Sequence, residues 1–323
     1  MFRLRLVPEK TRIDFFRWQW LTFGASMVAM AVSVILLFTM GLNMGIDFRG
    51  GTSIRTESSQ PIDVGAYRTA MTPLGLGDVV ITEVFDPTYG PDRNVAMIRV
   101  QAQEGEESMS PQSVETILQT LQEVSPDIRF VAVESVGAKV SGELIWTAVL
   151  SVVAATAAIL FYIWIRFEWQ FAIGAVVGLI HDVIVTLGIF VVFQIRFDLA
   201  IIAALLTIVG YSINDTVVVF DRVRENLIKF KTMPLRDILN LSSNDTLSRT
   251  VMTSTSTLLA LLGLLIFGGD VIRGFVVAIC LGVILGVYST IYVAKNIVLM
   301  LGVNRTPPKS AEKGPGGTQF TTS

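Results

Sequence analysis

Residues 18–46 read WQWLTFGASMVAMAVSVILLFTMGLNMGI, a stretch without a single charged side chain. A helix of about 20 apolar residues spans the ~30 Å hydrocarbon core of a membrane, so this stretch predicts a transmembrane helix. Two further apolar segments, 170–195 and 199–220, are each interrupted by one aspartate, Asp182 and Asp215 respectively. Three other runs of at least 20 residues also lack Asp, Glu, Lys and Arg: 144–165, 250–269 and 274–294. The sequence therefore predicts six transmembrane helices.

The composition agrees with a membrane protein. The 323 residues are 52% hydrophobic and 16% charged, whereas soluble chains carry ~25% charged residues. An ordinary soluble enzyme and a disordered protein are thereby excluded. One cysteine, Cys280, excludes an internal disulfide, and one histidine, His181, excludes a His-rich metal site. The net charge of −2 gives the whole chain no attraction to nucleic acid.

The distribution of basic residues predicts the topology. Five precede the first helix, which is too long for the ~7–15-residue apolar region of a signal peptide and is read as uncleaved. Because cytoplasmic loops are enriched in Lys and Arg, the N-terminus is predicted to be cytoplasmic. The 222–249 segment carries six basic residues and is predicted to lie on the same side, whereas the short outer turns carry only Arg196 and Arg273. The five N-terminal basic residues are Arg3, Arg5, Lys10, Arg12 and Arg17.

Because each helix crosses the membrane, the segments between the helices are predicted to lie alternately on its two sides. The 222–249 segment is consistent with short amphipathic helices on the inner membrane surface, and equally with a solvated connector. The last residues are rich in Pro, Gly, Ser and Thr, a composition typical of disorder. In chain order we predict a cytoplasmic N-terminus (1–17), a helix (18–40), an outer domain (41–142), helices at 143–165, 170–195 and 199–221, a cytoplasmic amphipathic loop (222–249), helices at 250–268 and 272–301, and a disordered cytoplasmic tail (302–323).

The outer segment 41–142 has a different pattern, with period-two alternation typical of strands and two helical stretches. The order β-α-β-β-α-β is that of the ferredoxin-like split unit. Its 14 acidic and 7 basic residues favour solubility and give no indication of nucleic-acid binding. The predicted elements are strands at 52–57, 78–85, 94–101 and 128–136, and helices at 62–71 and from Ser110 onward.

Ionisable residues within the apolar segments are the candidates for chemistry. An Asp at the centre of a bilayer costs ~2.5–3.5 kcal/mol, which is tolerated where it faces a cavity, a partner or a proton path. Asp182 is at such a depth, and Asp215 is consistent with either a proton relay or a buried structural partner. Arg222 follows Asp215 by seven residues and shares its helix face. Charges at an inner helix end are routine, so Asp221 and Arg222 also have a purely interfacial reading. The candidate proton-coupling residues are Asp182, Asp215, Arg222, Asn214, Asp221 and His181.

A cluster of hydroxyl residues opens the fifth helix, at Thr250 and 253–257. Isolated hydroxyls in membrane helices bond their own backbone, but this density also suggests a polar lining formed by Thr253, Ser256 and Thr257. Two GxxxG pairs, in the third and sixth helices, indicate close helix packing. No phosphate-binding loop of the GxxxxGK[ST] type occurs, so ATP use is unsupported.

Five motifs resemble those of one known family: GIDFRGGT at 45–52, HD at 181–182, GYSINDT at 210–216, FDRVREN at 220–226 and SRT at 248–250. Through them the sequence, over about residues 15–302, closely resembles the SecF branch of the SecD/SecF family of bacterial protein-export membrane proteins, within the RND superfamily. In the first motif, the resemblance assigns family roles to Gly45, Asp47, Gly50 and Gly51.

The resemblance implies a multi-pass α-helical membrane protein that forms half of a pseudo-symmetric twelve-helix unit with SecD. It implies use of the proton motive force to assist late steps of preprotein translocation, with protons as coupling ion and no other cofactor. The implied partners are SecD, the SecYEG channel with its SecA motor, YajC, YidC, the unfolded exported polypeptide and membrane lipid. The implied location is the bacterial inner membrane, with both termini cytoplasmic and 41–142 periplasmic.

Two other functions agree less well with the sequence. A proton-coupled RND transporter of small solutes carries about twelve helices and two large outer domains in one chain, whereas this chain predicts six helices and one domain. An intramembrane protease could use Asp182 and Asp215 as an aspartate pair, but the GxGD context of such enzymes is absent. We therefore predict an export subunit that is not an enzyme.

Overall fold

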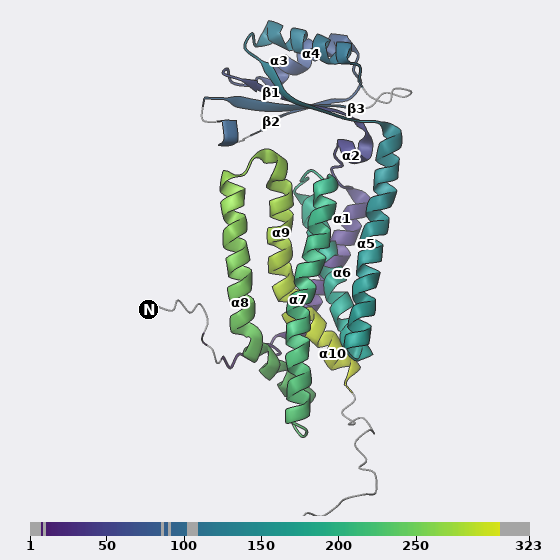
Figure 1. The fold of residues 1–323 in the computed structure, drawn as a ribbon, viewed down its shortest axis with the longest axis vertical. Coiled ribbons are helices and arrows are strands. Elements are labelled where there is room, and N and C mark those ends of the chain that lie inside the picture. Colours follow the sequence, from purple (N-terminus) through teal and green to yellow (C-terminus); the bar gives the residue numbers. More distant parts are fainter. Residues whose placement is uncertain (1–7, 9–10, 85–86, 90–91, 102–108, 304–323) are drawn as a thin grey trace, which may run out of the picture.

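The computed structural model describes residues 8, 11–84, 87–89, 92–101 and 109–303. Long helices form an elongated bundle, and a small sheet domain sits at one end of it (Figure 1). We call this end of the bundle the sheet end and the opposite one the far end. Within the described ranges, six helical stretches are long and apolar enough to cross a membrane, which confirms the predicted six: Gln19–Thr39, Val140–Arg166, Trp169–Val192, Leu199–Lys229, Leu235–Phe267 and Asp270–Leu301.

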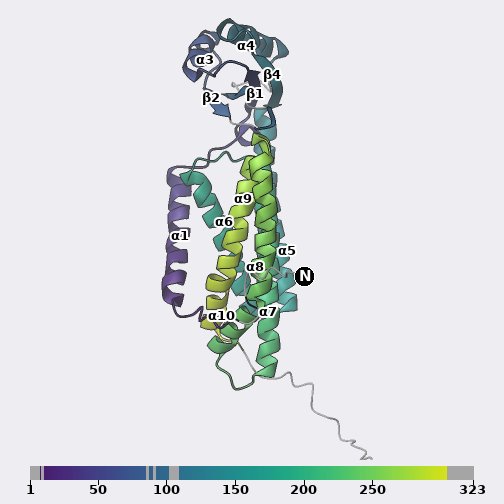
Figure 2. The same ribbon diagram turned by 90° about the vertical axis from the view of Figure 1, so that its left-hand side faces the viewer.

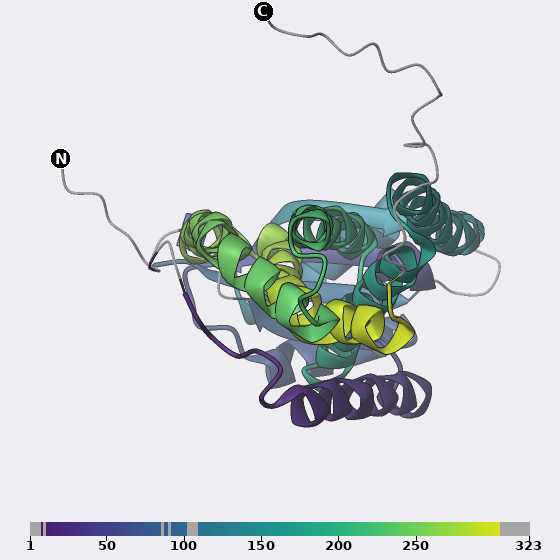
Figure 3. The same cartoon turned by 90° about the horizontal axis from the view of Figure 1, so that it is seen from below.

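Three of these stretches form the centre of the bundle. In the most apolar 18-residue windows of the stretches that contain α6, α7 and α9, 50%, 44% and 33% of the residues are buried, against 11% in those of α1, α5 and α8. Figure 2 shows α1 standing along one side of the bundle, and the view from the far end in Figure 3 agrees. The helices are α1 (Gln19–Thr39), α5 (Ala138–Arg166), α6 (Trp169–Val192), α7 (Leu199–Lys229), α8 (Leu235–Phe267), α9 (Asp270–Ser289), the π-helical η3 (Thr290–Ala294) and α10 (Lys295–Leu301).

The sheet domain has the predicted ferredoxin-like order. Its four strands are antiparallel and are arranged β2-β3-β1-β4. Helices α3 and α4 cover the face turned away from the bundle (Figure 1), and Ile54, Ile98 and Leu121 are fully buried in the domain core. The elements are β1 (Gly51–Ser58), α3 (Val64–Met71), η1 (Thr72–Leu74), β2 (Val79–Val84), η2 (Pro87–Tyr89), β3 (Asn94–Gln101), α4 (Pro111–Val124) and β4 (Arg129–Val136), preceded by the short α2 (Ile46–Arg49).

The 222–249 segment differs from the predicted loop. Helix α7 continues to Lys229 and α8 begins at Leu235, so 230–234 is the whole connection. The apolar residues between the basic ones explain this, because Ile238 and Leu239 are completely buried in the core at the far end. Pro234 stands at the N-cap of α8, where proline is tolerated. The predicted tail lies almost entirely outside the described residues.

Glycines bring the central helices close together, as the GxxxG spacing predicted. A Cβ on Gly174 of α6 would lie 2.8 Å from the carbonyl oxygen of Ala294 in η3. A Cβ on Gly282 of α9 would collide with the Ile208 side chain of α7, and one on Gly286 would lie 3.2 Å from the Cβ of Ser212. Helices α7 and α9 can therefore touch along their backbones.

Two alanine substitutions separate this packing role from helix propensity. We expect Gly282→Ala to destabilise the protein by about 1–3 kcal/mol, because the new methyl group overpacks the contact with Ile208. The control is Gly210→Ala in α7, where a Cβ would meet nothing within 4 Å. That change should stabilise the helix slightly, since Ala has the better propensity. Thermal melts of the purified full chain in detergent measure both, and equal shifts would contradict the packing role.

An acidic residue of the sheet domain gives a pH-dependent stability. Asp127 accepts hydrogen bonds from the hydroxyls of Ser58 (2.9 Å) and Ser125 (3.2 Å), and from the backbone N–H (2.6 Å) and hydroxyl of Ser59. These donors, those of Ser59 first, hold the pKa of Asp127 well below its usual range. The carboxylate therefore stabilises the fold fully above its unfolded pKa of about 4, and this contribution is lost as the pH falls further.

We accordingly expect the sheet domain, expressed as residues 41–142, to fold alone and to melt at progressively lower temperature below about pH 4. Asp127→Asn should melt lower than the wild type at pH 7, with a shallower decline on acidification. Circular dichroism melts from pH 7 to pH 2 measure this. Parallel pH profiles for the two proteins would contradict the role of Asp127, and absence of a cooperative melt would contradict the domain boundary.

Candidate functional site

The polar centre of the bundle is built around Asp182 in the middle of α6, whose side chain is completely buried. Its Oδ2 accepts hydrogen bonds from Ser212 Oγ of α7 at 2.7 Å and from Ser289 Oγ of α9 at 2.8 Å. Its Oδ1 lies 3.0 Å from Nδ1 of His181. A buried carboxylate is costly unless it is hydrogen-bonded, and here two other helices supply the donors. We call these four residues the Asp182 cluster.

Polar contacts extend from this cluster to the first helix. The imidazole of His181 stacks on the Tyr288 ring with their centroids 6.0 Å apart. The Tyr288 hydroxyl donates to the carbonyl oxygen of Thr22 (2.9 Å) and accepts from Ser26 (3.0 Å), both in α1. Four of the six membrane-spanning stretches are thus connected through the surroundings of one carboxylate.

The second intramembrane carboxylate, Asp215, lies one turn beyond Ser212 on α7. It is 6% exposed, and its Oδ2 has no hydrogen-bond partner among the described residues. The positive charge of Arg249 on α8 attracts the Asp215 carboxylate. Its neighbour Asn214 is exposed on the bundle surface. Asp215 is therefore a buried acid whose oxygen can still accept a proton or a new donor.

The charged residues at the far end of α7 pair with residues of α5, α7 and α8 and make no hydrogen bond to the Asp182 cluster among the described residues. Arg222 donates from Nε to Asp245 of α8 at 2.9 Å and from Nη1 to Glu225 at 2.7 Å. Asp221 accepts from Arg166 of α5 at 2.8 Å. The Arg222 and Asp221 side chains are 42% and 45% exposed, and such exposed pairs contribute ~0–1 kcal/mol each. Their role as proton-coupling residues stays a prediction.

The hydroxyls predicted to line a polar path bond mainly to their own helix. Thr253 donates to the carbonyl oxygen of Arg249 (3.1 Å) and Ser256 to that of Met252 (2.8 Å). Thr257 donates to the Thr253 carbonyl (3.0 Å) and lies 3.4 Å from the Tyr211 hydroxyl. The structure therefore does not bring these three residues to Asp182, and the backbone-bonding alternative describes their contacts.

The GIDFRGG motif forms a joint between the sheet domain and α7. The Gly45 N–H donates to the Phe197 carbonyl at 2.7 Å, and a Cβ on Gly45 would lie 3.3 Å from that oxygen. Asp47 Oδ2 accepts from the backbone N–H of Leu199, the first residue of α7, at 3.0 Å. Gly50 and Gly51 have φ of 73° and 121°, values that favour glycine, where the chain turns into β1.

Two charged residues, Arg249 and Lys295, were not among the predicted site residues, although Arg249 lies in the SRT motif. Lys295 at the start of α10 is completely buried, donates to the Ser243 hydroxyl, and lies 4.8 Å and 5.2 Å from the ring centroids of Phe15 and Phe16. No carboxylate among the described residues pairs with it. The sequence contains one indication of its importance, because Lys295 is the one charged residue between 274 and 304.

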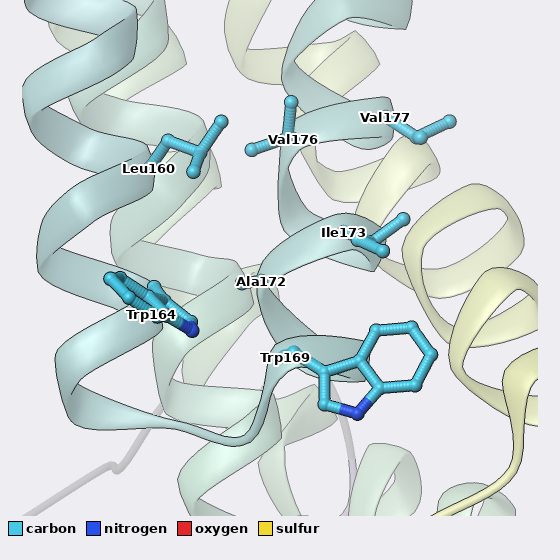
Figure 4. Close-up of a pocket in the computed structure, with 7 residues that line it drawn as sticks. All are labelled: Leu160, Trp164, Trp169, Ala172, Ile173, Val176 and Val177. Carbon is cyan, nitrogen blue, oxygen red and sulfur yellow. The ribbon is translucent and has the colours of Figure 1, made fainter.

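A separate hollow of about 300 Å³ lies between α5 and α6 (Figure 4). Figure 4 shows Trp164 on α5 and Trp169 at the start of α6 among the side chains that line it. Its lining has no ionisable group and none of the predicted site residues, so it is unsuited to proton chemistry. It is lined by Leu160, Trp164, Trp169, Ala172, Ile173, Val176 and Val177.

Fold and site together define a multi-pass membrane protein with a terminal ferredoxin-like domain and a buried, hydrogen-bonded carboxylate between its central helices. The C-terminal family model of the protein export membrane proteins SecD/SecF matches residues 116–304, and the SecD/SecF GG motif model matches 35–62. The chain belongs to the SecD/SecF family of protein export membrane proteins, as its motifs predicted.

Curated relatives match nearly end to end. The chain is 61% identical to the protein translocase subunit SecF of Cereibacter sphaeroides over 99% of this chain and 98% of that protein. It is 62% identical to SecF of Rhodobacter capsulatus over 95% and 94%. Membership of a family of translocase subunits also confirms that the chain is not an enzyme.

Solved structures agree with the fold. The crystal structure of SecDF from Thermus thermophilus, described as a translocon-associated membrane protein, superposes with a TM-score of 0.81 at 32% identity. SecDF in a super-membrane-facing form superposes with a TM-score of 0.68 at 34% identity. The match covers 92% and 93% of this chain but only 39% and 40% of the SecDF chains, so this chain spans about two fifths of their length.

Proposed function

We propose that this chain is the SecF-type subunit of a protein-export translocase, and that with a SecD partner it uses the proton motive force to assist late steps of preprotein translocation and release. A role in protein export is supported by the identity of 61% and 62% to SecF subunits over nearly the whole chain. A SecD partner is supported by the longer SecDF chains, of which this chain matches two fifths. YajC, YidC and the SecYEG channel are further proposed partners.

The observation that carries proton coupling is the bonding of Asp182. As a carboxylate it only accepts hydrogen bonds, and it now accepts them from α7 and α9. When protonated it becomes a donor as well, so the serine hydroxyls that point at it must rearrange. Because the carboxylate is buried where polar interactions are strong, one proton changes how tightly these helices are held. Protons are therefore the proposed coupling ion.

The GIDFRGG joint offers a route from that change to the sheet domain. Asp47 and Gly45 bond to Leu199 and Phe197 at the start of α7, and the same segment continues into β1. In this proposal a shift of α7 at Ser212 is transmitted along the helix to β1, one of the two central strands of the sheet. In this proposal the sheet domain then moves against the unfolded exported polypeptide.

The proposed orientation follows from charge. The far end is proposed to lie in the cytoplasm of a bacterial inner-membrane protein and the sheet domain in the periplasm, which the basic residues at the far end, among them Arg222 and Arg236, support. The SecD half is proposed to cover the surface of α7 and α8, where Asn214 and Ser256 are exposed within apolar spans. An exposed amide is expensive in lipid, and a protein partner offers it hydrogen bonds.

Translocation into inverted inner-membrane vesicles tests the function. Vesicles containing this chain and its SecD partner should import a preprotein faster when a proton gradient is present. Vesicles depleted of this chain should import at the slower rate, with or without the gradient. Restoring the chain without SecD should not restore the stimulation. Equal stimulation by the gradient in depleted and complete vesicles would contradict the proposal.

A further inference from the structure

A cavity of about 310 Å³ lies between the underside of the sheet and the sheet end of the bundle. Its walls come from the segment after α1, from β2 and β3, and from the turn after α6. Asn43 and Gln194 line it within a few residues of the ends of α1 and α6. The cavity therefore lies at the depth where membrane spans end, which is the headgroup region of a bilayer.

The cavity contains more positive than negative charge. Arg49 and Arg99 both line it, and Asp78 is the one carboxylate among its described lining residues. Neither arginine forms an ion pair within the described part of the chain. The Nε of Arg99 is buried with no hydrogen-bond partner. A buried N–H group without an acceptor is destabilising, and an anion bound in the cavity would supply that acceptor.

The neighbouring arginines strengthen this conclusion. Burial, and after it the charges of Arg196 and Arg49, lower the pKa of Arg99. A guanidinium still stays protonated at any physiological pH, so Arg99 cannot avoid the cost of burying its charge near other arginines by losing a proton. Arg196 itself is already neutralised by Asp198, its Nε lying 3.0 Å from the carboxylate. Of these three arginines, Arg49 and Arg99 thus have no ion pair among the described residues, and both line the 310 Å³ cavity. Arg99 also lines a neighbouring hollow, which contains Arg196, Asp198 and Glu83.

We propose that this cavity binds a phosphate group, through Arg49 and Arg99, and that the phosphate is the headgroup of a membrane phospholipid. A planar guanidinium offers paired N–H donors that match phosphate oxygens. The depth of the cavity favours a lipid over free phosphate, because lipid headgroups are concentrated there. A lipid bound at this place would tether β3 and the GIDFRGG joint, which contains Arg49, to the membrane surface.

Native mass spectrometry of the delipidated full chain in detergent tests this assignment with three probes. They are phosphatidylglycerol, a diacylglycerol with the same acyl chains, and inorganic phosphate. We expect the wild type to retain phosphatidylglycerol, and Arg99→Gln to weaken that retention on the order of tenfold, as loss of a charged hydrogen-bond partner predicts. Arg99→Lys should fall between the two, because it keeps the charge but loses the planar fork.

The matched control is Arg129→Gln, an exposed arginine on β4 of the same domain, which should retain the lipid as the wild type does. Equal retention by Arg99→Gln and wild type, in samples with equal melting temperatures, would overturn the proposal. Equal retention of diacylglycerol would show that the tails alone bind. Tight binding of phosphate alone would assign the site to the free ion, and displacement of the lipid by an acidic unfolded peptide would assign it to the exported chain.

Discussion

Asp182→Asn should remove the stimulation of export by a proton gradient while basal export continues. The amide keeps the shape of the carboxylate but cannot take up and release a proton. Its oxygen can take the place of Oδ2 and accept from Ser212 and Ser289, but its NH₂ group then replaces Oδ1 beside Nδ1 of His181. One mismatched buried hydrogen bond costs about 1–3 kcal/mol, which the fold should survive. The measurement is preprotein import into inverted vesicles with and without the gradient.

The matched control is Asp237→Asn, the same change in the first turn of α8 at the far end. Asp237 is exposed, so its replacement should change stability by no more than about 0.5 kcal/mol and leave the stimulation near the wild-type level. Ser212→Ala and Ser289→Ala should each give a partial defect, because each removes one of the two donors. Normal gradient stimulation in Asp182→Asn, at equal protein amounts, would reduce Asp182 to a packing role.

The membrane spans and the sheet domain could be predicted because each follows from a local pattern. A bilayer of fixed thickness demands uncharged runs of fixed length, and 18–46 shows one without ambiguity. Period-two alternation defined 94–101, the bounds that β3 has. Depth along a span likewise singled out Asp182, since the position of a charge within an apolar run can be read directly.

The partners of these residues could not be predicted, because they come from distant parts of the chain. Ser289 is 107 residues from Asp182, and Leu199 is 152 from Asp47. The sequence spacing of Arg222 and Asp215 indicated a shared helix face, but it could not show that Asp245 from α8 would take the guanidinium. Arg222 and Asp245 meet only because α8 folds back beside α7.

The sequence alone did not single out Lys295, because a charge near the end of an apolar stretch is routine. The structure buries its side chain completely. An unpaired buried ammonium is costly to desolvate, and the rings of Phe15 and Phe16 offset only part of this. Ser243 does not depend on Lys295, because its hydroxyl also donates to the Leu239 carbonyl at 2.9 Å. Lys295 lies in the same membrane-spanning stretch as Ser289. Because a buried charge is so costly, Lys295 is a further candidate for proton coupling.

Lys295→Met should therefore stabilise the protein and weaken its coupling. Methionine has nearly the same length and no charge, and replacing buried charges by apolar side chains often stabilises by about 1–4 kcal/mol. We expect a higher melting temperature in detergent together with a smaller gradient stimulation of export. Lys229→Met, at the exposed end of α7, is the control and should change stability by no more than about 0.5 kcal/mol. A lower melting temperature for Lys295→Met would show that the aromatic contacts outweigh desolvation, and unchanged stimulation would remove Lys295 from the coupling path.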